Sequence, residues 1–400
     1  MEAVVLIRLA TVLMLLLASG CTNHPQRVSE PGRTSAARSE RASFQPPGWT
    51  SAPPIPSKQI GNDPQAVGWD GGFLLVNGEG GAEGRDEVVY ASKDGHTFRV
   101  ATPEAGIQPS SCCDRIVAAN GAAAYLLGWN TRNELVVWRT EDGSRWEAIP
   151  LELADLRLSR RDLELTIAAG PHGVMIVGRD SVAPPRHHGV YVWSSPDGRT
   201  FTAVTRVPGP VDTAPVTATL AATPQGFLLA MAAEKETRLL SSADGVHWQN
   251  IGAGFVDDGA VDHLASNADT TVMFAHRPGP EEPAPWYRRG GQWRRASLDP
   301  GRLPDAGVVP AEQLRVVAVH NWGTGFIAVG NTFGNEGQER SGLVWYSVDG
   351  SAWTRMPTRG NGFDRAWNLI DLLVSGRSAM LIGCGSDESA WLCTWKADVP

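Results

Sequence analysis

Five aspartates at regular positions are the first residues whose type and spacing could support chemistry. Paired carboxylates perform general acid–base catalysis, for example in glycoside hydrolysis. Each of the five lies two residues after a Ser or Thr and directly before a Gly, with an aromatic residue three positions beyond the Gly. An Asp-Gly pair between two apolar runs is typical of a β-hairpin turn, in which the Asp accepts backbone N–H groups and the Gly takes a positive φ. We therefore assign these aspartates to turns and not to catalysis: Asp94, Asp142, Asp197, Asp244 and Asp349.

Other arrangements that could support catalysis or ligand binding are weak. His187 and His188 are adjacent in a Pro-rich segment, a spacing that does not suit two ligands of one metal ion. The Gly-rich segment 78–81 precedes no helix, so it lacks the helix N-terminus that a phosphate-binding loop requires. No Ser-His-Asp or paired-Glu arrangement can be assigned. The sequence therefore predicts no catalytic residue, no bound metal and no cofactor.

The Asp-Gly turns belong to a repeat of about 50 residues. Each unit contains two further apolar runs before the pair that flanks the turn, which predicts four short strands per unit. This period and strand number are the signature of a β-propeller, in which each blade packs only on its neighbours. We predict an all-β fold, a seven-bladed β-propeller of four-stranded antiparallel blades. The residues expected at equivalent positions of the second strands are Phe73, Tyr125, Val174, Phe227, Val272, Phe326 and Met380.

Two units depart from this pattern. The fifth, at Trp286–Trp293, keeps the aromatic residues and a Gly pair but has no Asp. The seventh, which ends near residue 397, has room for only three strands, whereas residues 48–53 near the start of the chain match residues 352–357 in Trp, Thr and Pro. We therefore predict that residues near 47–53 form the outer strand of the last blade and close the ring, which removes two exposed sheet edges. The alternative is that this segment only packs on a blade through its Trp.

The repeated turn resembles the Asp-box, or BNR repeat, of sialidase-like propellers, which reads Ser-x-Asp-x-Gly-x-x-Trp. The residue between Asp and Gly is absent in every copy here, so the resemblance is to a shortened form, and it covers the repeats from about residue 47 to 397. In that family the box lies on the hairpin between the third and fourth strands, away from the active face. The resemblance therefore implies a propeller scaffold and does not by itself imply sugar chemistry.

The residues that sialidases of this fold use are not matched in this chain. Such enzymes use three Arg for the substrate carboxylate, a Tyr nucleophile with a Glu partner and an Asp acid/base, and a Phe-Arg-Ile-Pro motif precedes the first box. No such motif occurs here, and Phe98-Arg99-Val100 follows a box instead. Every Tyr occupies an expected strand of the repeat, which leaves none as a nucleophile at a channel mouth: Tyr90, Tyr125, Tyr191, Tyr287 and Tyr346.

Charged residues recur where the first strand of each blade is expected to begin, at one mouth of the central channel. Mixed charge there could line a site for a polar ligand, and the alternative is a solvated rim with internal ion pairs. This possible ligand face comprises Asp114, Arg115, Arg161, Asp162, Asp262, His263, Arg315, Asp364 and Arg365.

The first 46 residues are not expected to belong to the fold. Arg8 precedes an apolar run, 9–17, that is short for a membrane span and typical of a signal peptide. The run ends Leu17-Ala-Ser-Gly-Cys21, which resembles the lipobox of bacterial lipoproteins and implies lipidation of Cys21. The protein is thus expected to be exported and held by lipid at the extracytoplasmic face of the cell membrane. The predicted parts are a lipoprotein signal peptide over 1–21, a flexible tether over 22–46 and the propeller over 47–397.

Four cysteines remain beside Cys21. Exported proteins can form disulfides, and Cys384 and Cys393 lie on consecutive expected strands of the last blade. We predict that these two form a disulfide. Cys112 and Cys113 are adjacent, and they either form a vicinal bridge or remain thiols.

The charge balance excludes one class of partner. Net charge is −8, from 35 basic and 43 acidic residues, and no basic block stands out, so nucleic acid is not expected to bind.

We predict a non-catalytic, membrane-anchored propeller, expected to be a monomer, that binds a partner protein or a glycan. The alternatives are a sialidase-like glycoside hydrolase whose acids lie in the inter-blade loops, and an assembly factor for an envelope complex.

Overall fold

In its described residues, the computed structural model contains seven β-sheets and one short separate hairpin, all within the unit Gln45–Pro400. The regular elements in the described part of the chain are strands, and no helix there is long and apolar enough to cross a membrane. The predicted signal peptide and tether, with Cys21, lie outside the described residues, as do Cys112 and Cys113. The residues that the structure describes are 49–51, 55–56, 64–79, 86–104, 107, 116–153, 163–180, 189–202, 205–208, 217–233, 236–252, 260–276, 283–300, 302–303, 307–308, 314–332, 342–356, 366–385 and 391–398.

Each of the first five sheets is a four-stranded antiparallel blade whose strands follow one another in chain order. Blade 1 comprises β3 (Gln65–Trp69), β4 (Gly72–Glu79), β5 (Asp86–Ser92) and β6 (Arg99–Val100). Blade 2 comprises β7 (Val117–Ala119), β8 (Ala124–Trp129), β9 (Leu135–Thr140) and β10 (Glu147–Pro150). Blade 3 comprises β11 (Leu163–Gly170), β12 (Gly173–Asp180), β13 (Gly189–Ser195) and β14 (Thr205–Pro208). Blade 4 comprises β15 (Thr217–Thr223), β16 (Gly226–Ala233), β17 (Glu236–Ser242) and β18 (Gln249–Asn250). Blade 5 comprises β19 (Ala260–Ser266), β20 (Thr270–His276), β21 (Ala284–Arg289) and β22 (Gln292–Arg295).

The last two blades have additional strands. Blade 6 comprises β26 (Leu314–Trp322), β27 (Gly325–Thr332), β28 (Gly342–Ser347) and β29 (Ala352–Arg355). The chain leaving blade 5 adds β23 (Ser297–Leu298), which pairs in parallel with β29 and covers that outer edge. The separate hairpin is β24 (Arg302–Leu303) with β25 (Gly307–Val308). Blade 7 comprises β30 (Ala366–Ser375), β31 (Ser378–Gly385), β32 (Trp391–Asp398), β1 (Thr50–Ser51) and β2 (Ile55–Pro56).

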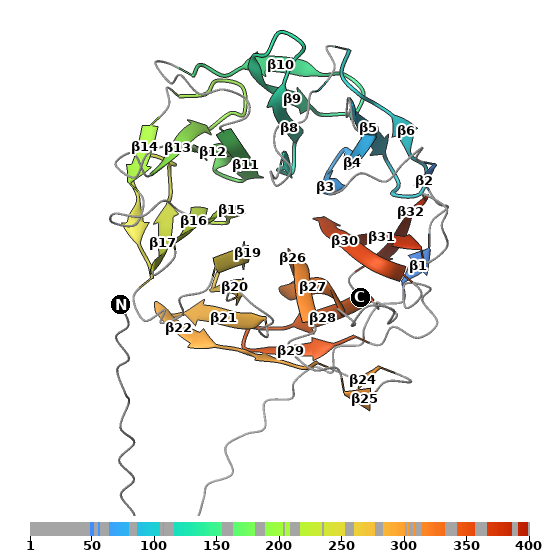
Figure 1. Cartoon of the computed structure of the whole chain (residues 1–400), viewed down its shortest axis with the longest axis vertical. Helices are drawn as coiled ribbons and strands as arrows, with labels where there is room; N and C mark the ends of the chain where they lie inside the picture. The colour runs from blue at the N-terminus through green and yellow to red at the C-terminus, as the bar shows by residue number, and fades with distance from the viewer. Residues whose placement is uncertain are drawn as a thin grey trace, which may run out of the picture. The chain divides into compact units, whose positions relative to one another are not determined.

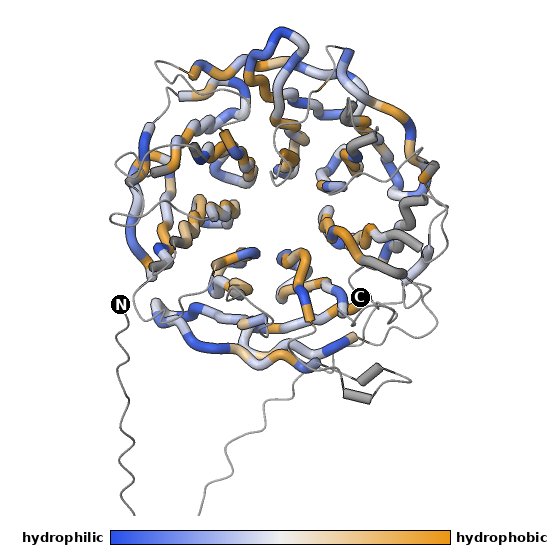
Figure 2. Tube along the Cα trace, viewed as in Figure 1, coloured by the Kyte–Doolittle hydropathy of each residue, from blue (hydrophilic) through white to orange (hydrophobic). Residues whose placement is uncertain are grey.

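The blades form a ring with their first strands nearest the centre (Figure 1). Figure 2 shows hydrophobic residues mostly on the strands nearer the centre and hydrophilic residues mostly along the outer strands and turns. All seven predicted anchors lie on the second strand of their blade, and the prediction of a seven-bladed, four-stranded propeller is confirmed. Apolar side chains of neighbouring blades pack together, and Trp146 and Trp293 donate Nε1–H to Ala101 O (2.7 Å) and Ile251 O (2.8 Å) of the preceding blade.

The ring closes through the N-terminal segment, as predicted. Thr50 pairs with Lys396 and Ser51 with Trp395, which makes β1 the outer strand of blade 7, and β2 pairs further along β32. Trp49, which is 5% exposed, packs on Trp322 of blade 6 with ring centroids 6.3 Å apart. In the same way Trp353 of blade 6 packs on Phe274 of blade 5 at 5.0 Å. Trp49 and Trp353, which occupy the same place in the two matching segments, therefore each pack against an aromatic ring of the preceding blade.

A small network of hydrogen bonds within each turn stabilises the Asp-Gly turns. In blade 1, Ser92 Oγ accepts from Gly95 N–H and donates to Asp94 Oδ1, both at 2.9 Å. Asp94 Oδ1 also accepts the N–H groups of His96 and Thr97, both at 2.8 Å. The turns of blades 2, 3, 4 and 6 repeat most of these bonds. Each of these carboxylates thus bonds to the backbone of its own turn.

The turn glycines pack against the preceding blade. At Gly245, with φ of 79°, a Cβ would lie 2.7 Å from Met175 Cε and 2.9 Å from Ser194 Cβ of blade 3. A Cβ on Gly198 of blade 3 would collide with the Tyr125 ring of blade 2. Only Gly combines this φ with so close an approach, so each turn fixes its blade against its neighbour. The other contacts of this kind join Gly95 to Met380, Gly143 to Trp69 and Gly350 to Val272.

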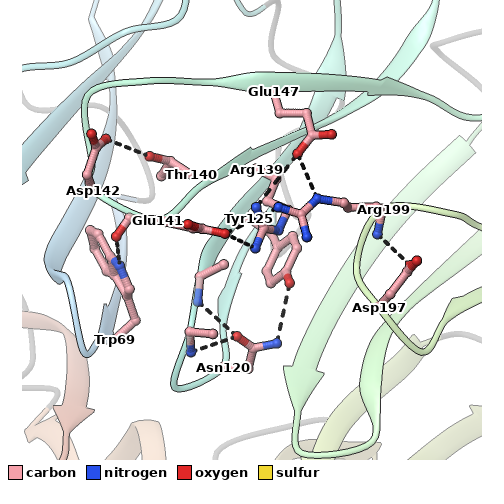
Figure 3. A network of polar contacts seen from close by, with 12 residues as sticks. Trp69, Asn120, Tyr125, Arg139, Thr140, Glu141, Asp142, Glu147, Asp197 and Arg199 are labelled. Carbon is pink, nitrogen blue, oxygen red and sulfur yellow. Dashed lines mark hydrogen bonds and ion pairs between the residues drawn. The ribbon is translucent and has the colours of Figure 1, made fainter.

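An ion-pair network supports one of these boundaries (Figure 3). The Arg139 side chain is 8% exposed and contacts Glu141 at 2.6 Å and Glu147 at 3.6 Å. Arg199, from the turn of blade 3, contacts the same two carboxylates at 3.3 and 3.2 Å. The hydrogen bond from Arg139 lowers the pKa of Glu141. Two cations and two anions therefore join blades 2 and 3 with balanced charge.

The low pKa values of the turn carboxylates predict that the protein loses stability in acid. Each carboxylate accepts hydrogen bonds from the backbone N–H groups of the residues three and two positions after it. These bonds hold the pKa of Asp94, Asp142 and Asp197 at about 2. An unfolded chain has an Asp pKa of about 3.9, so this contribution is present above about pH 4 and is lost as pH falls towards about 2. A variant with Asn at all three positions keeps the side-chain acceptor but cannot titrate. Urea unfolding between pH 5 and 2 should show a shallower acid decline in this variant, and an unchanged decline would contradict the assignment.

Candidate functional site

One mouth of the channel lies where the first strand of each blade begins and the second strand ends. A cavity of about 200 Å³ opens there against blades 3, 4 and 5. Its polar lining consists of Glu164, Thr166, Arg179, Thr219, Asp262 and His263. Its apolar lining consists of Leu165, Val177, Ala218, Leu220, Leu264 and Val319.

Opposite charges face each other on the blade 3 side of this cavity. Glu164 and Arg179 are direct partners in the ladder between β11 and β12, and their side chains form an ion pair. Both side chains are partly buried, at 32% and 18% exposure, so solvent screens the pair less than it would a surface pair. This wall therefore presents donor and acceptor groups with no net charge.

Hydrogen bonds between blades fix the other walls. Thr219 Oγ1 in β15 donates to Val261 O in β19 at 2.6 Å. His263 Nε2 in β19 lies 3.1 Å from Val316 O in β26. A carbonyl oxygen only accepts, so His263 carries a proton on Nε2. These side chains are therefore held in place before any ligand arrives.

Similar bonds continue around the ring. Gln65 Oε1 accepts from Ile116 N–H at 2.8 Å, and Asp371 Oδ2 accepts from Ala66 N–H at 3.0 Å. Asn331 exchanges two hydrogen bonds with the backbone of Leu369, both 2.7 Å long. Asp371 follows a register shift in β30, which places its buried carboxylate where blade 1 can use it. The inner strands are thus joined to one another by side chains as well as by packing.

Most side chains of the channel below the mouth are apolar. A second cavity of about 190 Å³ is lined by the first strands of all seven blades, and most of its residues are Ala, Val, Leu, Ile or Gly. It shares Leu220, Leu264 and Val319 with the mouth cavity. A ligand at the mouth would therefore meet polar side chains on the walls and mostly apolar side chains below them.

The structure places three of the nine residues of the possible ligand face. Asp262 and His263 line the mouth cavity. Arg315 is an exposed residue at the start of β26 and is not among those lining residues. The other six lie outside the described residues: Asp114, Arg115, Arg161, Asp162, Asp364 and Arg365.

Sequence reasoning missed Glu164 and Arg179. A signal was present, because a tight turn between Gly170 and Gly173 fixes the register of the hairpin. Counting back from that turn pairs Glu164 with Arg179 at the open end. Opposite charges directly across an antiparallel ladder stabilise it, so this pair could have been found.

The predicted disulfide lies on neighbouring strands of blade 7. Cys384 in β31 pairs with Leu392 in the ladder, and Cys393 in β32 pairs with Gly383. The two cysteines are therefore adjacent but not direct cross-strand partners, and their disulfide stays a prediction.

The arrangement at the mouth favours hydrogen bonding to a small polar group. Within the described ranges, no group of three or more His, Cys, Asp or Glu could hold a metal ion. Glu164 and Asp262 supply carboxylate acceptors, Thr219 a hydroxyl and Arg179 a guanidinium donor in one cavity.

Comparison with solved structures gives the fold. The chain aligns over 88% of its length with an acylaminoacyl peptidase of Pyrococcus horikoshii, at 8% identity and a TM-score of 0.51, and spans about half (52%) of that chain. It aligns over 88% of its length with 96% of the β-propeller domain of the Trilobed protease from Pyrococcus furiosus, at 9% identity and a TM-score of 0.50. That domain is described as having an open velcro topology, whereas here β1 pairs with β32. The fucose-binding lectin of Aleuria aurantia, a six-bladed propeller, aligns with 76% of this chain and 98% of its own at 15% identity and a TM-score of 0.44. No protein-family model and no curated protein sequence matches the chain. The comparisons therefore establish the β-propeller fold and no activity.

Proposed function

We propose that this protein is an exported, membrane-anchored propeller whose channel mouth binds a glycan or a partner protein without catalysing a reaction. The observation that carries the proposal is the cavity of about 200 Å³ at which Glu164, Arg179, Thr219, Asp262 and His263 meet. Of the two ligands, a glycan fits this lining better. Sugar hydroxyls both donate and accept hydrogen bonds, and the lining offers acceptors and donors with an ion pair among them.

The rigidity of the walls supports a binding role. Thr219 and His263 are tied to neighbouring blades, so little side-chain entropy is lost when a ligand is bound. The cavity lies below the roughly 300–1,000 Å³ typical of small-molecule sites. It would therefore hold one sugar ring of a longer glycan, with the rest of the glycan outside.

Asp262→Ala tests this proposal. We expect it to weaken glycan binding by the full-length chain about 10- to 150-fold, because a hydrogen bond to a charged group contributes about 1.5–3 kcal/mol. A glycan array identifies the ligand, and isothermal titration with that glycan gives the affinity. Asp70→Ala is the matched control, because Asp70 is also an exposed Asp but directly follows the first strand β3, at the opposite face. Equal affinities for the two variants would contradict the assignment of the site to the channel mouth, and no glycan bound at all would contradict the choice of a glycan as the ligand.

A glycoside hydrolase is the second candidate. The observation that favours it is that two carboxylates, those of Glu164 and Asp262, line the same cavity, and glycosidases use two carboxyl groups. A panel of chromogenic glycosides separates the two functions. If the protein hydrolyses a glycoside and both Glu164→Gln and Asp262→Asn abolish that turnover, the function is hydrolysis and not binding alone.

Membrane anchoring and family kinship rest on the sequence resemblances alone. We propose that Cys21 is lipidated and that the Asp-Gly turns are a shortened Asp-box of the sialidase-like kind. The position of these turns between third and fourth strands supports the second point. Membrane association that survives Cys21→Ala would contradict the first.

A further inference from the structure

Blade 5 lacks the turn that fixes other blades against their neighbours. Its third and fourth strands are joined by Gly290–Gly291, and Arg289 pairs directly with Gln292. The two glycines have φ values of 60° and 86°, as a two-residue hairpin turn requires. A Cβ on Gly290 would meet no described atom within 4 Å, and one on Gly291 would meet only Arg288 Nη2, at 3.9 Å. This turn therefore does not reach blade 4.

A cavity of about 420 Å³ occupies the position that the turn leaves open. Between blades 3 and 4, Gly245 packs on Met175 and Ser194, which are cross-strand partners. The equivalent cross-strand pair in blade 4 is Leu228 with Ser241. Both of these residues line the cavity. The surface that receives a peptide turn at five other blade boundaries therefore receives none here, although Leu228 itself is only 7% exposed.

The polar groups of this lateral cavity indicate the charge of an occupant. Arg288 Nε is buried and has no hydrogen-bond partner among the described residues. A buried donor without an acceptor is costly, and a carboxylate is the acceptor whose geometry matches a guanidinium. Asp244 cannot serve, because its oxygens accept backbone N–H groups of its own turn and bond to His247 Nδ1 at 2.7 Å. Asp269 lies exposed at the rim, where solvent and salt screen its charge.

We propose that the lateral cavity is a second binding site, which takes a peptide turn of a partner protein and places an acidic side chain of that turn on Arg288. Shape argues for a peptide turn, because the equivalent surfaces of blades 1, 2, 3, 5 and 7 each hold one. Charge argues for an acidic residue, because the Arg288 side chain lines the cavity and its Nε has no hydrogen-bond partner among the described residues. The cavity lies at the face of the Asp-Gly turns, opposite the channel mouth. Both sites can therefore be occupied at once, and neither proposal depends on the other.

Three small probes test the site in the full-length chain. N-acetyl-Asp-Gly-amide, N-acetyl-Asn-Gly-amide and succinate are titrated while the amide resonances of Gly290 and Gly291 are followed by NMR. The Asp peptide should bind about tenfold more tightly than the Asn peptide, because only the first offers a charged acceptor. Arg288→Gln should remove this preference. Arg289→Gln is the matched control, because Arg289 is exposed, does not line the cavity and should leave the preference intact.

A graft provides an independent check. Replacing Gly290–Gly291 by the turn sequence from Asp244 to His247 should cover the cavity, abolish binding of the Asp peptide and raise the melting temperature of the free protein. Equal binding of the Asp and Asn peptides would overturn the proposal, as would unchanged binding by Arg288→Gln or by the graft. Tighter binding of succinate than of the Asp peptide would overturn the assignment to a peptide partner.

Discussion

Trp49→Ala should lower the free energy of unfolding by about 3–5 kcal/mol, the usual cost of removing a buried Trp side chain. The side chain is 5% exposed and packs on Trp322, far from it in sequence. Its loss leaves a cavity at the boundary between blades 6 and 7, where the ring closes. Thermal denaturation followed by near-ultraviolet circular dichroism should show a fall in melting temperature of roughly 5–10 °C. Deletion of residues 48–53 should cost more, because it also removes β1.

Thr50→Ala is the control for this experiment. Thr50 is the next residue and begins β1, but it is exposed, and its Oγ donates a hydrogen bond to Lys396 O at 3.3 Å. Its replacement should change stability by no more than about 0.5 kcal/mol. If Trp49→Ala lowered the free energy of unfolding no more than Thr50→Ala does, the packing of the closing segment would not stabilise blade 7.

Gly198→Ala should destabilise the protein by about 2–5 kcal/mol. About 1–2 kcal/mol arises because a non-Gly residue resists a φ of 67°. A further 1–3 kcal/mol arises from overpacking, because the new methyl group collides with the Tyr125 ring, which is 1% exposed. Urea unfolding monitored by Trp fluorescence measures the change.

Gly290→Ala separates the two contributions. Its φ of 60° is nearly the same as that of Gly198, but a Cβ there meets no described atom within 4 Å. It should therefore cost only the backbone part, about 1–2 kcal/mol. If both variants lost the same stability, the turn of blade 5 would be packed like the others, which would also contradict the open lateral cavity.

The repeat made the fold predictable from sequence. Asp-Gly pairs with the same flanking residues identify hairpins, and their spacing identifies blades, because local turn chemistry is independent of what the ring binds. Closure was predictable because Trp49 and Trp353 occupy equivalent places in two segments that match in sequence. The absence of an Asp in blade 5 was visible too, but its consequence was not. Whether a missing turn leaves a cavity depends on how far Gly290–Gly291 extends, which is a matter of three-dimensional packing.

The mouth site was predictable only in part. Asp262 and His263 were found because charged residues at the start of a first strand must lie near the channel. Arg179 was missed because it lies on a second strand, and only the hairpin register brings it to Glu164. Arg315 also lies at a first-strand start but does not line the cavity, because strand position fixes the height of a residue in the ring and not the direction of its side chain.

Closure by the N-terminal segment has a mechanical consequence. Any force applied to the chain before residue 49 reaches the body of the protein through Trp49, which packs on Trp322, and through β1, which has two residues and pairs with β32. Blades 1 to 5 are continuous along the chain and do not bear that load directly. Under tension the molecule would yield first at blade 7, so the place at which it opens is set by its topology.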